Sequence, residues 1–297
     1  MSRDPIRPTP IFSIIIAAYN GWEPLEGCLR SVSEQTYCPP FEVVVVDDGS
    51  EQKAPESIHE WNKSYPLMVV RQAHSGIPTA RNRGAQESRG HILVFTDADC
   101  RLEPHCLARL AEIISASSQH DCFQLHLTGD SSTLIGRAEQ LRLIAIQDQT
   151  LQPDGRIRFL NTSGFAIRRI HRSIHVGPFD TTVLRGEDTL LLASLMQNGE
   201  LPLFVTKAKV RHSVSLSVFQ CLRKDLRSGW LAGITFKAVS ARGVRIRIRN
   251  KERIRMLYST WKISHQPSIG HSAWFVLVGR QLFERTVTVF YQCLPGK

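Results

Sequence analysis

The sequence predicts an α/β fold in which helices sandwich a mainly parallel sheet. Apolar runs alternate with helical stretches over residues 1–115, and this alternation is typical of parallel strands joined by helical crossovers. The run at 41–46 contains four consecutive valines, which indicates a strand covered on both faces. Polar residues follow these runs, at the positions where the strands of such a sheet would end.

The elements of this first part follow one another in order. Strands are expected at 12–18, 41–46, 67–71 and 91–96. Helices are expected at 24–34, 55–63, 79–88 and 104–116. The last of these helices is placed at Pro104 because the fixed φ angle of proline suits a first helical turn.

The rest of the chain has a different pattern of expected elements. Residues 120–215 carry mixed short strands, with helices expected near 135–147 and 188–197. Beyond residue 218 the chain becomes strongly basic, and residues 271–294 suit an amphipathic helix. We therefore expect three parts, at 1–118, 119–217 and 218–297, the last being a basic helical C-terminal extension.

Composition excludes several classes of protein. The 297 residues are 42% apolar and 22% charged, as in an ordinary globular protein. The apolar run at 273–278 is far shorter than the roughly 20 residues that a membrane-spanning helix requires. The seven cysteines include no CxxC pair, so they fit neither a disulfide framework nor a cysteine zinc site. A cytoplasmic location, peripheral at the inner face of the membrane, is the expectation.

The net charge of +10 is unevenly distributed. Residues 201–297 hold 18 Lys and Arg against 3 Asp and Glu, so an anionic neighbour is expected there. At 244–249 arginines alternate with aliphatic residues, and a strand would place the three arginines on one face. With the helix at 271–294, this favours an anionic membrane surface as partner, although a helix packed on the protein's own core is the alternative. Nucleic acid is not an expected partner, because no known binding module accompanies the charge.

Polar clusters at the strand ends predict a site. Tyr19 follows the first strand, Asp47 and Asp48 follow the second, and Asp97 and Asp99 follow a later one. Ligands bind at the carboxyl ends of parallel strands, so these residues should converge on one crevice. Closely spaced carboxylates repel unless a hard cation such as Mg²⁺ or Mn²⁺ neutralises them, and a phosphate-bearing ligand is therefore expected.

Five stretches taken together resemble the family 2 glycosyltransferases, which have the GT-A fold. They lie at 12–20, 43–50, 76–84, 95–99 and at 162–169 leading to 186–188. Each is weak alone, but their order and spacing over residues 11–215 are specific. The resemblance implies that 1–118 is the nucleotide-sugar-binding half and that 119–217 binds the acceptor and carries the catalytic base.

The resemblance also implies roles for single residues. The positions expected to bind the nucleotide are Ala17, which stands where relatives often have proline, Tyr19, Asp47, Asp48, Arg81 and Asp97, with Asn82 next to Arg81. The alternative for Asp47 and Asp48 is an Asx turn that ends the strand. For Arg81 and Asn82 the alternative is an exposed helix face.

The metal and the base follow from the same resemblance. Asp99, with Asp97 and His212, is expected to hold the divalent cation, Mn²⁺ or Mg²⁺. Asp188 matches the catalytic base, and Glu187 would assist or orient it. A helix-capping role for Asp188 and a structural role for His212 are the alternatives.

The expected function is an inverting, metal-dependent transfer from a nucleotide-sugar donor, UDP-linked by preference, to a hydroxyl of a glycan or lipid-linked acceptor. Processive relatives carry Gln-x-x-Arg-Trp, whereas Gln220-Cys-Leu-Arg-Lys224 lacks the tryptophan, so a non-processive enzyme is expected. A nucleotidyltransferase is the first alternative, disfavoured because 17–22 contains no Lys or Arg for a triphosphate. A non-catalytic nucleotide-binding scaffold is the second.

Overall fold

The chain divides into two compact units, each assembled from several stretches of sequence. The structure is a computed structural model and describes residues 9–130, 132–171, 177–183, 186–213, 217–241, 243 and 250–293. Unit 1 comprises Met1–His126, Thr162–Phe179 and Val205–Val210. Unit 2 comprises Leu127–Asn161, Asp180–Phe204 and Arg211–Lys297. The arginine-rich stretch at 244–249, expected as a strand, lies outside the described residues.

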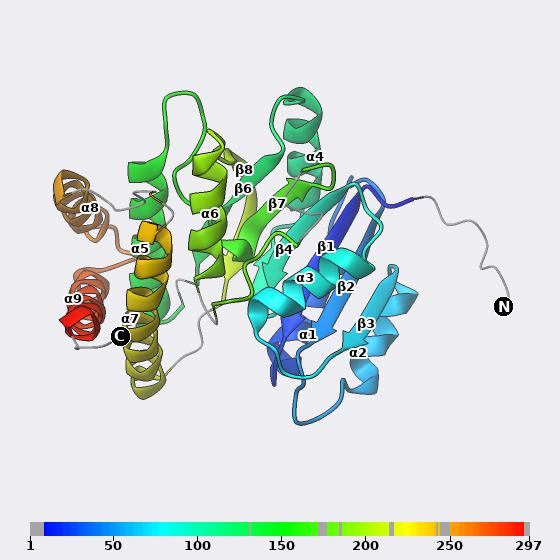
Figure 1. Cartoon of the computed structure of the whole chain (residues 1–297), viewed down its shortest axis with the longest axis horizontal. Helices are drawn as coiled ribbons and strands as arrows, with labels where there is room; N and C mark the ends of the chain where they lie inside the picture. The colour runs from blue at the N-terminus through cyan, green and yellow to red at the C-terminus, as the bar shows by residue number, and fades with distance from the viewer. Residues whose placement is uncertain are drawn as a thin grey trace, which may run out of the picture. The chain divides into compact units, whose positions relative to one another are not determined.

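One sheet of eight strands runs through the described residues, in the order β3-β2-β1-β4-β7-β6-β8-β5 (Figure 1). The strands are β1 (Phe12–Ala18), β2 (Phe41–Asp47), β3 (Leu67–Arg71), β4 (Ile92–Asp97), β5 (Cys100–Leu102), β6 (Cys122–Gly129), β7 (Phe165–Arg168) and β8 (Leu203–His212). β1 pairs in parallel with β2 and β4, and β2 with β3, whereas β7 pairs antiparallel with β4 and β6. The parallel half confirms the prediction from strand and helix alternation.

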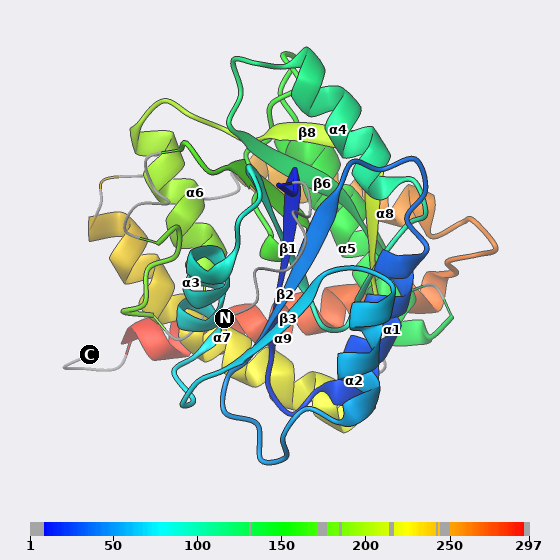
Figure 2. The ribbon, with the colours of Figure 1, turned by 90° about the vertical axis from the view of Figure 1, so that its right-hand side faces the viewer.

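The helices of unit 1 cover both faces of the parallel strands. They are α1 (Trp22–Ser33), α2 (Glu56–Glu60) with the 3₁₀ turn η1 (Trp61–Lys63), α3 (Ile77–Glu87) and α4 (Cys106–Ala116), and a second 3₁₀ turn, η2, lies at Thr162–Gly164. Figure 2 shows α3 on one side of the strands and α1 and α2 on the other. The valines at 43–46 are consequently at most 1% exposed, which confirms the doubly covered strand that they predicted.

The differences from the expected elements are small and local. The strand β5 was not expected, because three residues are too few to produce a periodic pattern. The helix expected from Pro104 begins instead at Cys106, with His105 as the N-cap residue. The basic extension is helical as expected.

Unit 2 contains the remaining helices of the described chain. They are α5 (Leu134–Thr150), α6 (Glu187–Gln197), α7 (Val218–Ala241), α8 (Asn250–Ile263) and α9 (His271–Cys293). Both α8 and α9 pack against α5, while α7 packs against α9 and α6. Among the described residues, no helix combines the length and the apolar character needed to cross a bilayer.

Buried charges hold the helices of unit 2 together. Arg280 of α9 donates two hydrogen bonds to the carboxylate of Asp225 on α7, at 2.7 and 2.8 Å. On α5, burial disfavours ionisation of Glu139, but the adjacent Arg142 guanidinium more than offsets this and lowers the pKa of that carboxyl to about 2. Removing one partner of such a pair leaves an uncompensated charge in the core. The Arg280–Asp225 pair therefore fixes how α9 aligns with α7, whereas the Arg142–Glu139 pair lies within α5.

The seven cysteines are all free thiols. Five are buried, Cys38 is half-buried and Cys293 is exposed. Burial raises the pKa of the Cys38 thiol, which makes the thiolate scarcer at neutral pH.

Two consecutive arginines at the end of β7 cap two different helices. Arg168 donates to the carbonyl oxygen of Ile114, in the last turn of α4, at 2.8 Å, and to that of His120, beyond the end of α4, at 3.0 Å. Arg169 donates to the carbonyl oxygen of Ala85, in the last turn of α3, at 3.1 Å, and to that of Gly90, after α3, at 2.7 Å. The last carbonyls of a helix have no partner within it, so the guanidinium groups supply the missing donors.

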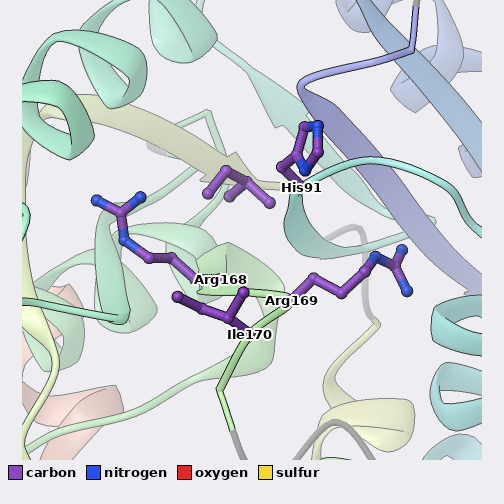
Figure 3. Close-up of a pocket in the computed structure, with 5 residues that line it drawn as sticks. His91, Arg168, Arg169 and Ile170 are labelled. Atoms are coloured by element: carbon purple, nitrogen blue, oxygen red, sulfur yellow. The ribbon is translucent and has the colours of Figure 1, made fainter.

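These arginines border a pocket of about 500 Å³ at the amino end of β4. The pocket is lined by His91, Ile92, Arg168, Arg169 and Ile170. The two guanidinium groups point away from each other, each toward the helix that it caps (Figure 3). Their positive charge therefore serves the helix ends, at the edge of the sheet opposite the carboxyl end of β4.

We expect Arg169→Ala to lower the free energy of unfolding by about 2–4 kcal/mol, because it removes charged donors from the end of α3. Urea denaturation followed by circular dichroism measures this change. Arg83→Ala is the control, because Arg83 forms an exposed pair with Glu87 within α3 and should contribute about 0.5 kcal/mol or less. Equal effects of the two substitutions would contradict the capping role.

Candidate active site

The carboxyl ends of three parallel strands bring the expected residues of unit 1 together. In the sheet register, Ala17 of β1 lies between Val46 of β2 and Asp97 of β4, and Ala18 lies beside Asp47. Residues far apart in sequence are therefore neighbours at one edge, as the strand order predicted. The small Ala17 side chain lies on the strand between the two acidic strand ends.

Asp47 ends β2 and is buried, with an exposed fraction of 1%. One carboxylate oxygen accepts a hydrogen bond from the backbone N–H of Ser50 at 2.9 Å, and the other accepts one from Nη1 of Arg71 at 2.8 Å. Gly49, between Asp47 and Ser50, has φ +77°, and a Cβ there would lie 2.7 Å from the backbone nitrogen of His74. Asp47 thus forms the strand-ending turn that was its alternative role, and glycine is required within that turn.

Asp48 organises the loop that leads into α3. Its carboxylate accepts the backbone N–H groups of Ser75 and Gly76 at 2.9 and 2.8 Å and Nε2 of Gln72 at 2.7 Å. Nδ1 of His74 lies 3.0 Å from the same carboxylate. Donors therefore surround both oxygens, and Asp48 fixes the conformation of residues 72–76.

An aromatic pair includes one residue of this loop. The rings of Tyr19 and His74 stack with their centroids 4.3 Å apart and their planes 27° apart. Tyr19 is half exposed, so its ring offers an accessible flat face. Such a face can stack a nucleobase, because every base has a π-surface. His74 was not among the predicted site residues, and its proximity to Tyr19 depends on the Asp48 loop.

Asp97 is held on both sides. One oxygen accepts Nη2 of Arg81 at 2.5 Å, and the other accepts the hydroxyl of Ser163 at 2.6 Å. Arg81 is only 2% exposed, and its guanidinium lies 5.7 Å from the ring centroid of Phe179. The exposed helix face that was the alternative for Arg81 is therefore wrong. The buried guanidinium orients the carboxylate at the end of β4.

The side chain of Asn82, next to Arg81, hydrogen-bonds to the main chain of Phe179. Its Oδ1 accepts the backbone N–H of Phe179 at 3.0 Å, and its Nδ2 donates to the carbonyl of the same residue at 2.8 Å. This double contact holds Phe179 against the ring of Phe95, with centroids 5.0 Å apart. In this arrangement the amide positions the chain around Arg81.

Asp99 lies half-buried after β4, and with Asp97 it gives this turn a strongly negative character. Burial, with the charges of Asp99 and Asp97, raises the pKa of Cys28 to about 12. Burial and the same two carboxylates also raise the pKa of Cys100 well above its usual value. Carboxylate oxygens are the donors that Mn²⁺ and Mg²⁺ prefer, so the side-chain chemistry of Asp97 and Asp99 fits the expected cation.

In unit 2, Glu187 and Asp188 form the first turn of α6. Gly186 precedes them with φ +87°, and a Cβ there would lie 2.5 Å from the hydroxyl oxygen of Thr235. The carboxylate of Asp188 accepts the backbone N–H of Thr189 at 2.6 Å. The N-cap residue is Gly186, so Asp188 lies within the helix, where the dipole favours a negative charge.

His212 ends β8 in unit 2 and is half-buried. Its carbonyl oxygen accepts the backbone N–H of Asp130 at 3.1 Å. Its charge is among the causes, after burial and Arg142, that act on the pKa of Glu139. His212 thus lies near the Glu139–Arg142 pair of α5.

Sequence reasoning missed three contributors in unit 1: Arg71, His74 and Ser163. Arg71 and His74 lie just before the stretch that was recognised, and Ser163 lies inside one but was given no role. The pattern Gln-Ala-His-Ser before Gly76 was the available signal for the Asp48 loop.

Solved structures of similar shape define the class of fold. The mannosyltransferase PcManGT from Pyrobaculum calidifontis, solved with GDP-Man and Mn²⁺, has a TM-score of 0.60 and 17% identity over 95% of this chain and 84% of that chain. S. aureus TarS 1–349 in complex with UDP has a TM-score of 0.56 and 17% identity, covering 95% of this chain and 88% of that one. The protein therefore has the GT-A fold of glycosyltransferases.

Sequence comparison gives the family. Residues 13–173, more than half of the chain, match Glycosyl transferase family 2, and the chain belongs to this family. Glycosyltransferase AglE of Haloferax volcanii is 35% identical over 111 residues, which are 36% of either chain. Dolichol-phosphate mannosyltransferase of Pyrococcus furiosus is 34% identical over 107 residues, 36% of this chain and 30% of the relative. The chain thus spans about a third of the length of these relatives.

We expect Asp48→Asn to lower the free energy of unfolding by about 2–3 kcal/mol, because an amide cannot accept from all the donors around Asp48. Hydrogen exchange should also become faster at residues 75 and 76, whose N–H groups the carboxylate holds. Glu112→Gln, on an exposed helix pair with Arg109, should change stability by about 0.5 kcal/mol or less. Unchanged exchange at residues 75 and 76 would show that the loop does not depend on Asp48.

Proposed function

We propose that the protein transfers a sugar from a nucleotide-sugar donor, UDP-linked by preference, to a hydroxyl of a glycan or lipid-linked acceptor. The observation that carries this proposal is the position of Asp97 and Asp99 at the carboxyl end of β4, next to the Asp47 turn. Membership of family 2 and the GT-A fold support it. Residues 1–118 would bind the donor, and 119–217 would bind the acceptor.

In this proposal the nucleotide binds at the strand ends of unit 1. The exposed face of Tyr19, backed by His74, would stack on the nucleobase, and the loop fixed by Asp48 would border it. Ala17 and Asp47 would form the floor of this binding site, on strands adjacent to Asp97. Solved GT-A neighbours hold GDP-Man and UDP.

The cation would be held by Asp99 together with Asp97, and His212 is the further ligand proposed on the family resemblance. When bound, Mn²⁺ or Mg²⁺ neutralises the charge that develops on the departing nucleoside diphosphate. Arg81 and Ser163 hold the Asp97 carboxylate in one orientation, so its geometry is set before a ligand arrives. Mn²⁺ is present in the solved complexes of PcManGT and GalNAc-T7.

The base would be Asp188. Its place in the first turn of α6 favours the ionised carboxylate, which can accept the proton of the acceptor hydroxyl. As that proton leaves, the hydroxyl oxygen bonds to the anomeric carbon and the bond to the nucleoside diphosphate breaks. A single displacement of this kind inverts the configuration at that carbon. Glu187, 6% exposed, would orient the helix turn.

We expect UDP to bind tightly only when Mn²⁺ is present, and Asp99→Asn to weaken that binding by about 100-fold, because a cation contributes several kcal/mol of charge stabilisation. Isothermal titration with UDP, GDP, dTDP and CDP, each with and without Mn²⁺, measures both effects. Asp121→Asn, an acid of unit 1 that lies 3.4 Å from Arg168, is the control and should bind like the wild type. Binding of none of the four nucleotides would overturn the proposed donor class.

We expect Asp188→Asn to reduce kcat for sugar transfer by at least about 100-fold while UDP and Mn²⁺ still bind, because a general base contributes about 10²–10⁴-fold. Thr189→Ala removes a hydroxyl contact 3.2 Å from the carboxylate but keeps the carboxylate itself, so its kcat should change little. Multiple-turnover product analysis should also find one sugar added per acceptor. Full transfer by Asp188→Asn would leave Asp188 with a structural role only.

A further inference from the structure

Helix α8 exposes its apolar side and buries polar side chains. Within residues 251–263, the buried side chains are Glu252 and Thr260, which are 6% and 2% exposed. On the opposite side, Ile254 is 67% exposed and Tyr258 is 61% exposed. A helix on the surface of a globular protein normally has the reverse arrangement, with its apolar stripe facing the core.

Specific contacts fix this orientation. Glu252 accepts Nη2 of Arg158 at 2.7 Å, and both side chains are largely buried. The hydroxyl of Thr260 lies 3.2 Å from the indole N–H of Trp274, which donates to it. Rotating α8 to bury Ile254 would break both contacts and leave the buried Arg158 without its carboxylate. The outward apolar side is therefore a stable property of the fold.

The exposed side chains form one continuous face. Ile254, Leu257, Tyr258 and Trp261 recur at intervals of three and four residues, which places them along one side of the helix. All four are at least 37% exposed. We name these four residues the α8 apolar face.

Positive charge borders the α8 apolar face. Lys251, Arg253, Arg255 and Lys262 are exposed on the same helix. The ammonium group of Lys262 lies 4.6 Å from the centroid of the Tyr258 ring. Among the described residues from 201 onward, the acidic side chains are all buried or half-buried: Asp225, Glu252 and Glu284. The electrostatic potential on this side is therefore positive.

We propose that the α8 apolar face docks onto an anionic lipid bilayer, with the basic residues contacting the head groups. Aliphatic side chains would enter the boundary of the acyl region, and tyrosine and tryptophan would lie at its polar interface. Each lysine or arginine near an anionic surface adds to the attraction. A second copy of the chain fits less well, because two such positive faces would repel each other. This inference does not rest on the sugar-transfer reaction.

The test is flotation of the full-length protein with vesicles of phosphatidylcholine containing 30 mol% phosphatidylglycerol. We expect binding to these vesicles, little binding to phosphatidylcholine alone, and a marked decrease in 0.5 M NaCl. Ile254→Ser with Tyr258→Ser should weaken partitioning by about tenfold. Lys251→Glu with Arg255→Glu should weaken it by at least about tenfold in 0.1 M salt.

Two control variants change other exposed residues, which lie in unit 1. Tyr37→Ser removes an aromatic ring that is 93% exposed, and Lys53→Glu reverses an exposed charge. Both should float like the wild type. Wild-type protein that fails to float, or an Ile254/Tyr258 variant that floats unchanged, would overturn the proposal. So would a wild-type dimer in light scattering that the same double variant makes monomeric, because the face would then bind a second copy.

The outcome is separable from the proposed enzymatic function. Flotation needs no nucleotide, and α8 carries none of the residues proposed to bind or react. The double variant should therefore retain nucleotide binding while it loses partitioning. Loss of nucleotide binding in that variant would point instead to a folding role for α8 and would also overturn the proposal.

Discussion

Repulsion among carboxylates is the constraint around which unit 1 is built. Asp47, Asp48 and Asp97 lie near the same edge of one parallel sheet, and each has a different set of donors. Asp47 pairs with Arg71, Asp48 accepts from main-chain N–H groups, and Asp97 is held by a buried arginine and a serine hydroxyl. Each carboxylate thus has its own hydrogen-bond donors, and these offset the repulsion between acidic side chains that lie near one another.

Many of the basic residues are likewise paired within the protein. A formal charge of +10 suggests many sites for anions, yet several arginines already have structural partners. Arg168 and Arg169 complete the ends of α4 and α3, Arg280 pairs with Asp225, and Arg81 orients Asp97. Net charge therefore predicts a ligand only where the guanidinium or ammonium groups are exposed, as they are along α8.

The sequence predicted those features that depend on local pattern. The parallel strands, their order of appearance and the convergence of Asp47 and Asp97 follow from apolar periodicity and from strand geometry. Contacts between residues far apart in the sequence leave no such pattern in it, so they were not predicted. Asn82 holds Phe179, 97 positions away, and nothing near either residue signals the pairing. The outward direction of the α8 apolar face was not predicted either, because it depends on contacts with Arg158 and Trp274 of other segments.

The distribution of thiols has a practical consequence for spectroscopy. Cys38 in unit 1 and Cys293 at the end of α9 are the cysteines that a reagent in solution can reach, while the other five are buried. The native chain thus offers one attachment point for a dye or spin label in each unit. Cys293 should react first, because burial raises the pKa of the Cys38 thiol. Distances between two such labels could follow the units as nucleotide is added, without any engineered cysteine.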